Sequence, residues 1–177
     1  MTVPGPLLHF SEDPSITRFV PHVPATNPGH EPAVWAIDAE HAPVYWFPRD
    51  CPRASVWAND DAQRDVLRTR FLSDARRINA TELGWLDRMR AARLYVYELD
   101  RAAFVEWPEA EGQWIASEVI EPLAVHEVGD LLDVHARAGV ELRFVTRLAP
   151  FWDEVVSCGL PFSGVRLRER GGKVGHA

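Results

Sequence analysis

Proline is distributed very unevenly along this chain, which limits what the first third can fold into. Ten of the fourteen prolines precede residue 53. Proline has a fixed φ and no N–H to donate, so it is excluded from helix interiors and central strands. The N-terminal third is therefore predicted to hold short strands and fixed loops, with a long proline-rich loop over residues 20–32.

Length, composition and charge narrow the class of protein. The 177 residues fit a single domain over 1–177, and 46% hydrophobic content with seven tryptophans excludes a disordered chain. A net charge of −7 argues against general nucleic-acid binding, which depends on many basic contacts to phosphates. Eight arginines lie between Arg64 and Arg93, interspersed with acidic residues, and this mixture is typical of a solvated helix face.

The cysteines and the hydropathy pattern bear on location. Cys51 and Cys158 are too few for a disulfide framework, which favours a reduced, cytoplasmic protein. The N-terminal MTVPGPLLHF lacks the basic and apolar regions of an export signal, and no run of about 18 apolar residues occurs. Neither export nor a membrane span is expected.

Periodicity and turn residues predict an α+β fold. Helices are expected from Asp38 to near Phe47 and over 61–73, 81–93, 128–138 and 149–157, and strands over 34–37, 54–58, 94–99, 104–107, 113–117, 119–125, 140–145 and 162–167. Their irregular alternation favours a single bent, mainly antiparallel sheet with flanking helices. Residues 59–93 are predicted to form a helical insertion.

The sharpest polar cluster is the turn from Arg49 to Arg53. Two arginines four positions apart around a proline are suited to a bidentate grip on a pyrophosphate. The alternative is that Asp50 pairs with one arginine and the turn is structural. Cys51 between them is expected to be a small buried residue, because no His and Asn partners for a nucleophile are evident.

Two aromatic and polar segments are further candidates for a binding site. His9 closes a short apolar run and Ser11 follows it, so both can contact a ligand; a structural histidine is the alternative. The predicted helix bearing Tyr45 must turn at least one aromatic ring away from the core, where it can stack on a planar ligand. Core packing is the alternative for any one ring.

A carboxylate and a set of histidines complete the search for chemistry. The segment from Gln113 to Glu118 is predicted to place Glu118 at a strand edge, where it can act in catalysis or be a solvated turn residue. The histidine spacings match no metal site, so no metal is expected, and Glu40 with His41 is interpreted as a solvated pair.

In sequence order, Leu8-His9-Phe10, Val34-Trp35-Ala36, the helix with Tyr45, and Trp114 to Glu118 resemble ADP-ribosyltransferase-like folds of the His-Tyr-Glu kind. The landmarks LxHFSED, WAID, FPRDCPR and FSGxRLR are also similar to those of a small bacterial family to which we can attach no activity. The resemblance implies that His9, Tyr45 and Glu118 are catalytic and that NAD is the cofactor. The matching departs from the usual pattern where Phe10-Ser11 replace a small residue and a threonine.

Combined with the polar clusters, the resemblance predicts an enzyme that transfers or removes an ADP-ribosyl group. The predicted cofactor contacts are Ser11, Arg49, Arg53, Trp114 and Ser117. Two alternatives stay open. One is a non-catalytic module that binds a nucleotide or a protein on the same scaffold, and the other is a small hydrolase using His9 with Asp13 or Glu12. The acceptor is not specified by the sequence.

Overall fold

The computed structural model describes residues 5–23, 29 and 31–167, which fall into two compact units. Unit 1 combines Met1–Ala42 with Leu94–Val128, and unit 2 combines Pro43–Arg93 with Gly129–Ala177. Residues 24–28 and 30 of the predicted proline-rich loop lie outside the described residues. Each unit contains one β-sheet and its own hydrophobic core, and α-helices pack on the sheet of unit 2. The chain as a whole is α+β.

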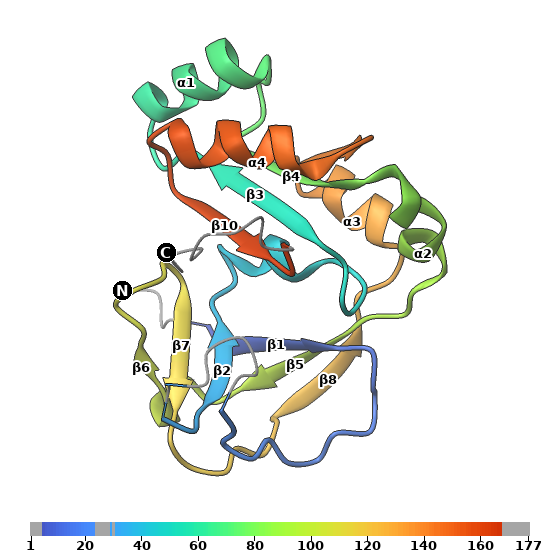
Figure 1. Ribbon diagram of the computed structural model, residues 1–177. Helices are drawn as coiled ribbons and strands as arrows, with labels where there is room; N and C mark the ends of the chain where they lie inside the picture. The colour runs from blue at the N-terminus through green and yellow to red at the C-terminus, as the bar shows by residue number, and fades with distance from the viewer. Residues whose placement is uncertain (1–4, 24–28, 30, 168–177) are drawn as a thin grey trace. The chain divides into compact units, whose positions relative to one another are not determined.

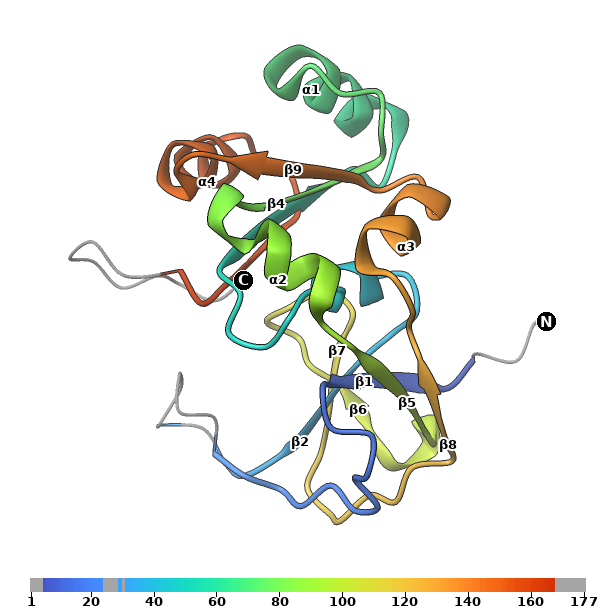
Figure 2. The ribbon, with the colours of Figure 1, turned by 90° about the vertical axis from the view of Figure 1, so that its right-hand side faces the viewer.

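Unit 1 is built on a six-stranded antiparallel sheet in the order β6-β7-β2-β1-β5-β8, and Figure 2 shows β5 and β8 side by side along one edge. Its elements are β1 (Leu7–Ser11), β2 (Val34–Ile37), β5 (Tyr95–Leu99), the 3-10 helix η3 (Arg101–Ala103), β6 (Val105–Glu106), β7 (Gln113–Ala116) and β8 (Ala124–Glu127). One face of the sheet carries the core, which includes Leu7, Val34, Tyr97 and Leu99. The Tyr97 hydroxyl donates to the Asp13 carbonyl at 2.6 Å, so the one polar atom of this buried ring is satisfied.

Unit 2 is built on a four-stranded sheet in the order β10-β3-β4-β9, in which β4 and β9 run parallel. In Figure 1, α4 lies along β3 and β4. The elements are η1 (Ala42–Tyr45), β3 (Arg53–Trp57), α1 (Asp61–Phe71), β4 (Arg77–Glu82), η2 (Leu83–Trp85), α2 (Leu86–Ala91), α3 (Leu131–Arg137), β9 (Glu141–Val145), α4 (Leu148–Ser157) and β10 (Phe162–Val165).

Helices α1 and α4 cover the apolar face of the unit 2 sheet. Val56 and Ile78 on the sheet pack with Leu67, Phe71 and Val155 on the helices in one buried cluster. Burial of such aliphatic and aromatic side chains contributes roughly 1.5–3 kcal/mol each. The apolar stripe of each helix is thus what fixes it to the sheet.

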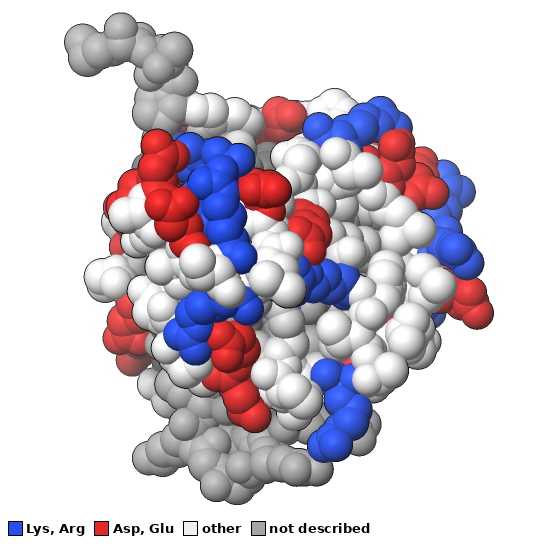
Figure 3. Space-filling view, turned by 90° about the horizontal axis from the view of Figure 1, so that it is seen from above, with Lys and Arg blue, Asp and Glu red and all other residues white. Residues whose placement is uncertain are grey.

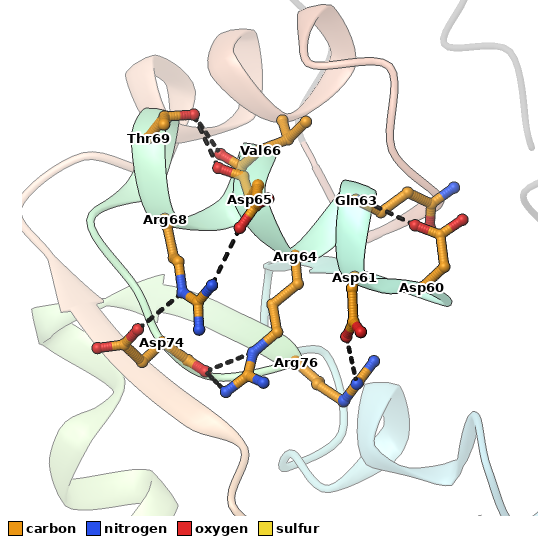
Figure 4. Close-up of polar contacts among 10 residues, drawn as sticks. All are labelled: Asp60, Asp61, Gln63, Arg64, Asp65, Val66, Arg68, Thr69, Asp74 and Arg76. Carbon is orange, nitrogen blue, oxygen red and sulfur yellow. Dashed lines mark hydrogen bonds and ion pairs between the residues drawn. The ribbon is translucent and has the colours of Figure 1, made fainter.

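The outer surface of α1 is held by polar contacts (Figure 4). Asp60 caps the helix by accepting from the Gln63 N–H at 2.7 Å. Arg68 reaches both Asp65 and Asp74 at 3.0 Å, and Arg76 pairs with Asp61 at 2.9 Å. Figure 3, viewed from above α1, shows basic and acidic side chains interspersed. The arginines on the outer surface of α1 accordingly belong to a mixed, solvated surface, as the sequence predicted, whereas Arg77 of the same predicted stretch is buried.

Several predicted elements are confirmed, and five expectations need correction. Strand 34–37 and the helix capped at Asp60 are present as predicted, while the strands form two sheets where one bent sheet was expected. The expected helix after Asp38 is only a 3-10 turn, η1. Residues 59–93 contain strand β4 between their helices, and β8 begins at Ala124 where a strand over 119–125 was predicted. The helix predicted from Val128 begins at Leu131, because Asp130 is its cap.

Candidate functional site

The two central strands of unit 2 bury a polar face opposite their apolar one. Side chains alternate across a strand, so Ala54 and Val56 point to the helices α1 and α4 and their neighbours in sequence point the other way. That second face carries the cross-strand pairs Arg53–Thr81, Ser55–Asn79 and Trp57–Arg77. All six side chains are buried. Buried polar groups require hydrogen-bond partners, so this face is the part of the molecule whose chemistry most needs an explanation.

Arg53 is the charged centre of this polar face. It is 6% exposed, its Nε donates to the Val44 carbonyl at 2.7 Å, and its Nη1 donates to the Cys51 carbonyl at 3.1 Å. The guanidinium carbon also lies 5.5 Å from the centre of the Tyr45 ring and 5.3 Å from that of Phe47. Burial lowers the pKa of Arg53 to about 10. The side chain is therefore fixed in position and still cationic at neutral pH.

The positive charge of Arg53 is not balanced by a carboxylate in the described part of the chain. No Asp or Glu of residues 5–23, 29 or 31–167 forms a salt bridge with it, and its hydrogen bonds go to two backbone carbonyls. Arg166 nearby acts further to lower its pKa, as a like charge does. A buried cation without a counter-charge is costly, which makes Arg53 the strongest candidate for contact with an anion.

His135 and Asn79 form the second polar group on this face. The His135 Nδ1 lies 2.6 Å from the Leu131 carbonyl, which can only accept, so Nδ1 carries the proton and Nε2 is an acceptor. The group that faces Nε2 at 3.0 Å must then be the Asn79 amide nitrogen, whose other hydrogen goes to the Pro43 carbonyl at 2.8 Å. Burial lowers the pKa of His135, which keeps the ring neutral.

Cys51 and Thr81 complete the polar face without adding a reactive group. The Thr81 hydroxyl donates to the Pro52 carbonyl at 2.8 Å and lies 3.2 Å from the Cys51 sulfur. Burial raises the pKa of the Cys51 thiol, so the sulfur stays protonated at neutral pH. The expectation that Cys51 is a small buried residue is confirmed.

Of the predicted site residues in unit 2, the structure brings Tyr45 and Arg53 together. Arg49 is exposed on the same turn. Asp50 pairs with Arg166 at 3.1 Å. Asp50 thus forms an ion pair, but its partner Arg166 follows β10 and is not one of the two arginines of the turn.

The predicted residues in unit 1 lie in different surroundings. His9 is on the core face of β1, where its Nδ1 contacts the Trp35 carbonyl at 2.9 Å and its ring lies 4.6 Å from that of Phe19. Ser11 is partly buried and its hydroxyl accepts from the Asp13 N–H at 3.1 Å. The contacts of His9 and Ser11 are therefore those of structural residues.

The segment predicted to supply the carboxylate ends earlier than expected. Strand β7 stops at Ala116, and Ser117 and Glu118 are exposed in the bend that follows. Trp114 lies under the Arg101 guanidinium, 4.5 Å from the ring centre. Glu118 is therefore not held at a strand edge, because the chain leaves the sheet two residues before it.

Sequence reasoning missed that His41 is buried in unit 1 and paired with Asp38. His41 is 5% exposed, and both its backbone N–H and its Nδ1 lie 2.8 Å from the Asp38 carboxylate. Its Nε2 is 3.7 Å from Glu111. The interpretation of Glu40 and His41 as a solvated pair is wrong for His41, since Asp38 turns the ring inward. The Asp38-x-x-His41 spacing at a helix start was the signal that could have indicated it.

Ser55 and Asn79 were missed as well. Their signal was the alternation of polar residues in Arg53–Trp57 and Arg77–Glu82, which indicates a solvent-facing side when each strand is taken alone. His135 on α3 was missed as the partner of Asn79.

A comparison with protein-family models matches residues 8–170 to one family of unknown function. The chain belongs to family DUF6886. The match includes every strand of both DUF6886 units except the first residue of β1. No curated protein and no solved structure matches the chain. Within the described residues of this DUF6886 chain, no helix is long and apolar enough to span a membrane, and no three His, Cys, Asp or Glu side chains are grouped as metal ligands.

Proposed function

We propose that this DUF6886 chain binds a small phosphate-bearing, nucleotide-like molecule, with Arg53 as the residue that contacts its negative charge. The observation that supports this most is the buried guanidinium, which has two carbonyl partners and two aromatic neighbours but no carboxylate among the described residues. Guanidinium groups bind phosphate oxygens through parallel N–H donors, and burial strengthens such bonds. Arg49 on the same turn provides a second, exposed cation.

A purely structural role for Arg53 is the competing explanation. Its bonds to the carbonyls of Val44 and Cys51 connect both sides of the turn that precedes β3. The two roles differ in what lysine can replace. Lysine keeps the charge but loses the planar fork, so a ligand role predicts a large loss of affinity, whereas a structural role predicts mainly a loss of stability.

The experiment is a thermal-shift and calorimetric titration of the wild-type protein with NAD, ADP-ribose and pyrophosphate, using adenosine as the uncharged comparison. We expect the phosphate-bearing compounds to raise Tm and adenosine to have no effect; a ligand at 100 times its Kd adds about 2.7 kcal/mol. Arg53→Lys should weaken binding by about tenfold or more. Arg68→Lys on the surface of α1 is the matched control and should bind normally.

The result that would refute the proposal is equally specific. If Arg53→Lys lowers Tm but leaves the affinity for every phosphate-bearing compound unchanged, Arg53 is structural. If none of these compounds shifts the wild-type Tm at millimolar concentration, the chain does not bind this class of ligand.

Within this class, the resemblance to ADP-ribosyltransferase-like folds makes NAD our specific candidate and ADP-ribosyl transfer or removal our candidate reaction. In transfer, the bond from the ribose to nicotinamide breaks, nicotinamide leaves with the bonding electrons, and the acceptor forms the new bond and loses a proton. The resemblance assigns a catalytic role to His9 and Glu118, which belong to unit 1, and separately to Tyr45, which belongs to unit 2. Nicotinamide release by wild type, with cell extract as acceptor source, is the measurement; Glu118→Gln should slow it by about 10²–10⁴-fold without loss of binding.

The exposure of Glu118 favours a second candidate, a non-catalytic binding module. A carboxylate in water stabilises a developing positive charge far less than one in a site that excludes water. Binding of NAD or ADP-ribose without any nicotinamide release, by wild type and with extract present, would support the module and contradict the enzyme.

A further inference from the structure

Two side-chain oxygens on the polar face of unit 2 are buried without a hydrogen bond. They are Ser55 Oγ and Asn79 Oδ1, and neither has a partner among the described residues. Ser55 is 1% exposed and Asn79 is 0% exposed. The two residues are directly opposite each other on β3 and β4 and point to the same face. Buried polar atoms of this kind are rare in folded proteins and ordinarily have a bound molecule as partner.

The surroundings determine what such a partner can be. Both hydrogens of the Asn79 amide are used, on the Pro43 carbonyl and on His135 Nε2, so the orientation of this amide is fixed and its Oδ1 can only accept. A flipped amide would place two acceptors together at Pro43. The partner must therefore carry a hydrogen that it can donate to Asn79, while the Ser55 hydroxyl can either donate or accept.

The charge of the partner follows from the same face. Arg53 and Arg77 are both buried there, so a third positive charge would be repelled. A fully ionised phosphate or carboxylate has no hydrogen to donate to Asn79 Oδ1. We infer that Ser55 and Asn79 together bind one neutral O–H or N–H group, supplied either by an internal water or by a hydroxyl of a bound sugar-like ligand.

This site does not depend on Arg53 binding an anion, because it rests on different atoms. The same face of the sheet also carries Ser163, which is paired with Ser55 on the edge strand β10 and is partly exposed, and whose hydroxyl is not one of the two unpartnered atoms.

The sign of the stability change in Ser55→Ala tests the inference. If a guest satisfies the hydroxyl, its removal loses a hydrogen bond and leaves the guest under-coordinated, and Tm should fall by a few degrees. If the hydroxyl is simply orphaned, its removal relieves a desolvation penalty and Tm should rise. Ser163→Ala, with the same chemical change on the same face, is the matched control and should change Tm little. An unchanged or higher Tm in Ser55→Ala would overturn the inference.

Two further measurements distinguish water from a ligand hydroxyl. Oxygen-17 magnetic relaxation detects long-lived internal waters, and Ser55→Ala should remove one from the ligand-free protein if water is the guest. If the guest is a ligand hydroxyl, Ser55→Ala should instead weaken ADP-ribose or another ribose-bearing compound while leaving pyrophosphate binding unchanged. A crystal structure in which Ser55 Oγ bonds directly to Asn79 Oδ1 with nothing between them would exclude both sources.

Discussion

Asp50 and Arg166 form a salt bridge at 3.1 Å, and both have left-handed backbone conformations, with φ of 66° and 55°. Each residue lies beside a strand end of the unit 2 sheet, where Val165 of β10 is paired with Arg53 of β3. The pair therefore joins the turn before β3 to the end of β10. Both side chains are substantially exposed, at 65% and 46%.

We expect Asp50→Asn to cost little and Asp50→Val to cost clearly more. Exposed ion pairs contribute about 0–1 kcal/mol, and asparagine tolerates a left-handed backbone. Valine loses the same pair and in addition strains the backbone by roughly 1–2 kcal/mol. Urea unfolding of the two variants measures the difference. Equal stabilities would show that the backbone of Asp50 relaxes on substitution.

Leu72 is the clearest position for a stabilising substitution. It ends α1 with φ 54° and ψ 43°, and its side chain is 87% exposed, so it contributes almost no burial. Glycine is the preferred residue at such a helix end, and Leu72→Gly should raise the free energy of unfolding by about 1 kcal/mol. Leu72→Ala removes the same apolar surface but retains Cβ and is expected to be nearly neutral. If the alanine variant gains as much as the glycine variant, the gain does not come from the backbone.

Gly112 should not tolerate a side chain. It has φ +76°, and a Cβ there would lie 2.3 Å from His41 Nδ1. We expect Gly112→Ala to destabilise the chain by the left-handed strain of about 1–2 kcal/mol plus an overpacking cost of about 1–3 kcal/mol. Gly129→Ala, at φ +88° with nothing within 4 Å, isolates the strain alone. Denaturant midpoints that are equal in the two variants would show that His41 moves aside freely.

Stability should depend on pH through His135. Burial lowers its pKa in the folded state, so the unfolded chain, with the ordinary value near 6.5, binds the proton first. This contribution to stability is complete above about pH 6.5 and declines as the pH falls below it, by at most about 1.4 kcal/mol per pH unit. Urea titrations between pH 8 and 5 measure the slope. His135→Gln should flatten it; a slope unaffected by this substitution would assign the dependence to other groups.

The sequence was sufficient where local signals were strong. Asp60 with its acidic neighbours predicted the start of α1, and Gly139 predicted the end of α3. Strand β4 was missed because four of its six residues, RINATE, are polar, and a mostly polar strand is recognisable only from what its faces contact in the folded chain. The division into two sheets depends on long-range pairing that no local pattern encodes.

The same reason explains the outcome for the candidate site. The Arg49–Arg53 turn was noticed because its charges lie close in sequence. The hydrogen-bond partners of Arg53 could not be predicted, because they are backbone carbonyls. Every residue has a carbonyl, so the sequence gives no sign of which ones the guanidinium contacts. Asn79 and His135 are separated by 56 positions, and only folding brings them together.

The segments of the two units alternate along the chain, and this order determines at which point of synthesis each unit can fold. Each unit needs one segment from before residue 94 and another from after it, and the parallel strands β4 and β9 are joined by a connection that includes residues 94–128 of unit 1. A ribosome that has made only the first half of the chain has therefore produced four of the ten strands and neither finished sheet. Such non-local pairing is expected to make folding slow and largely post-translational. Only a cut near residue 42 or residue 128 leaves both segments of one unit on the same fragment.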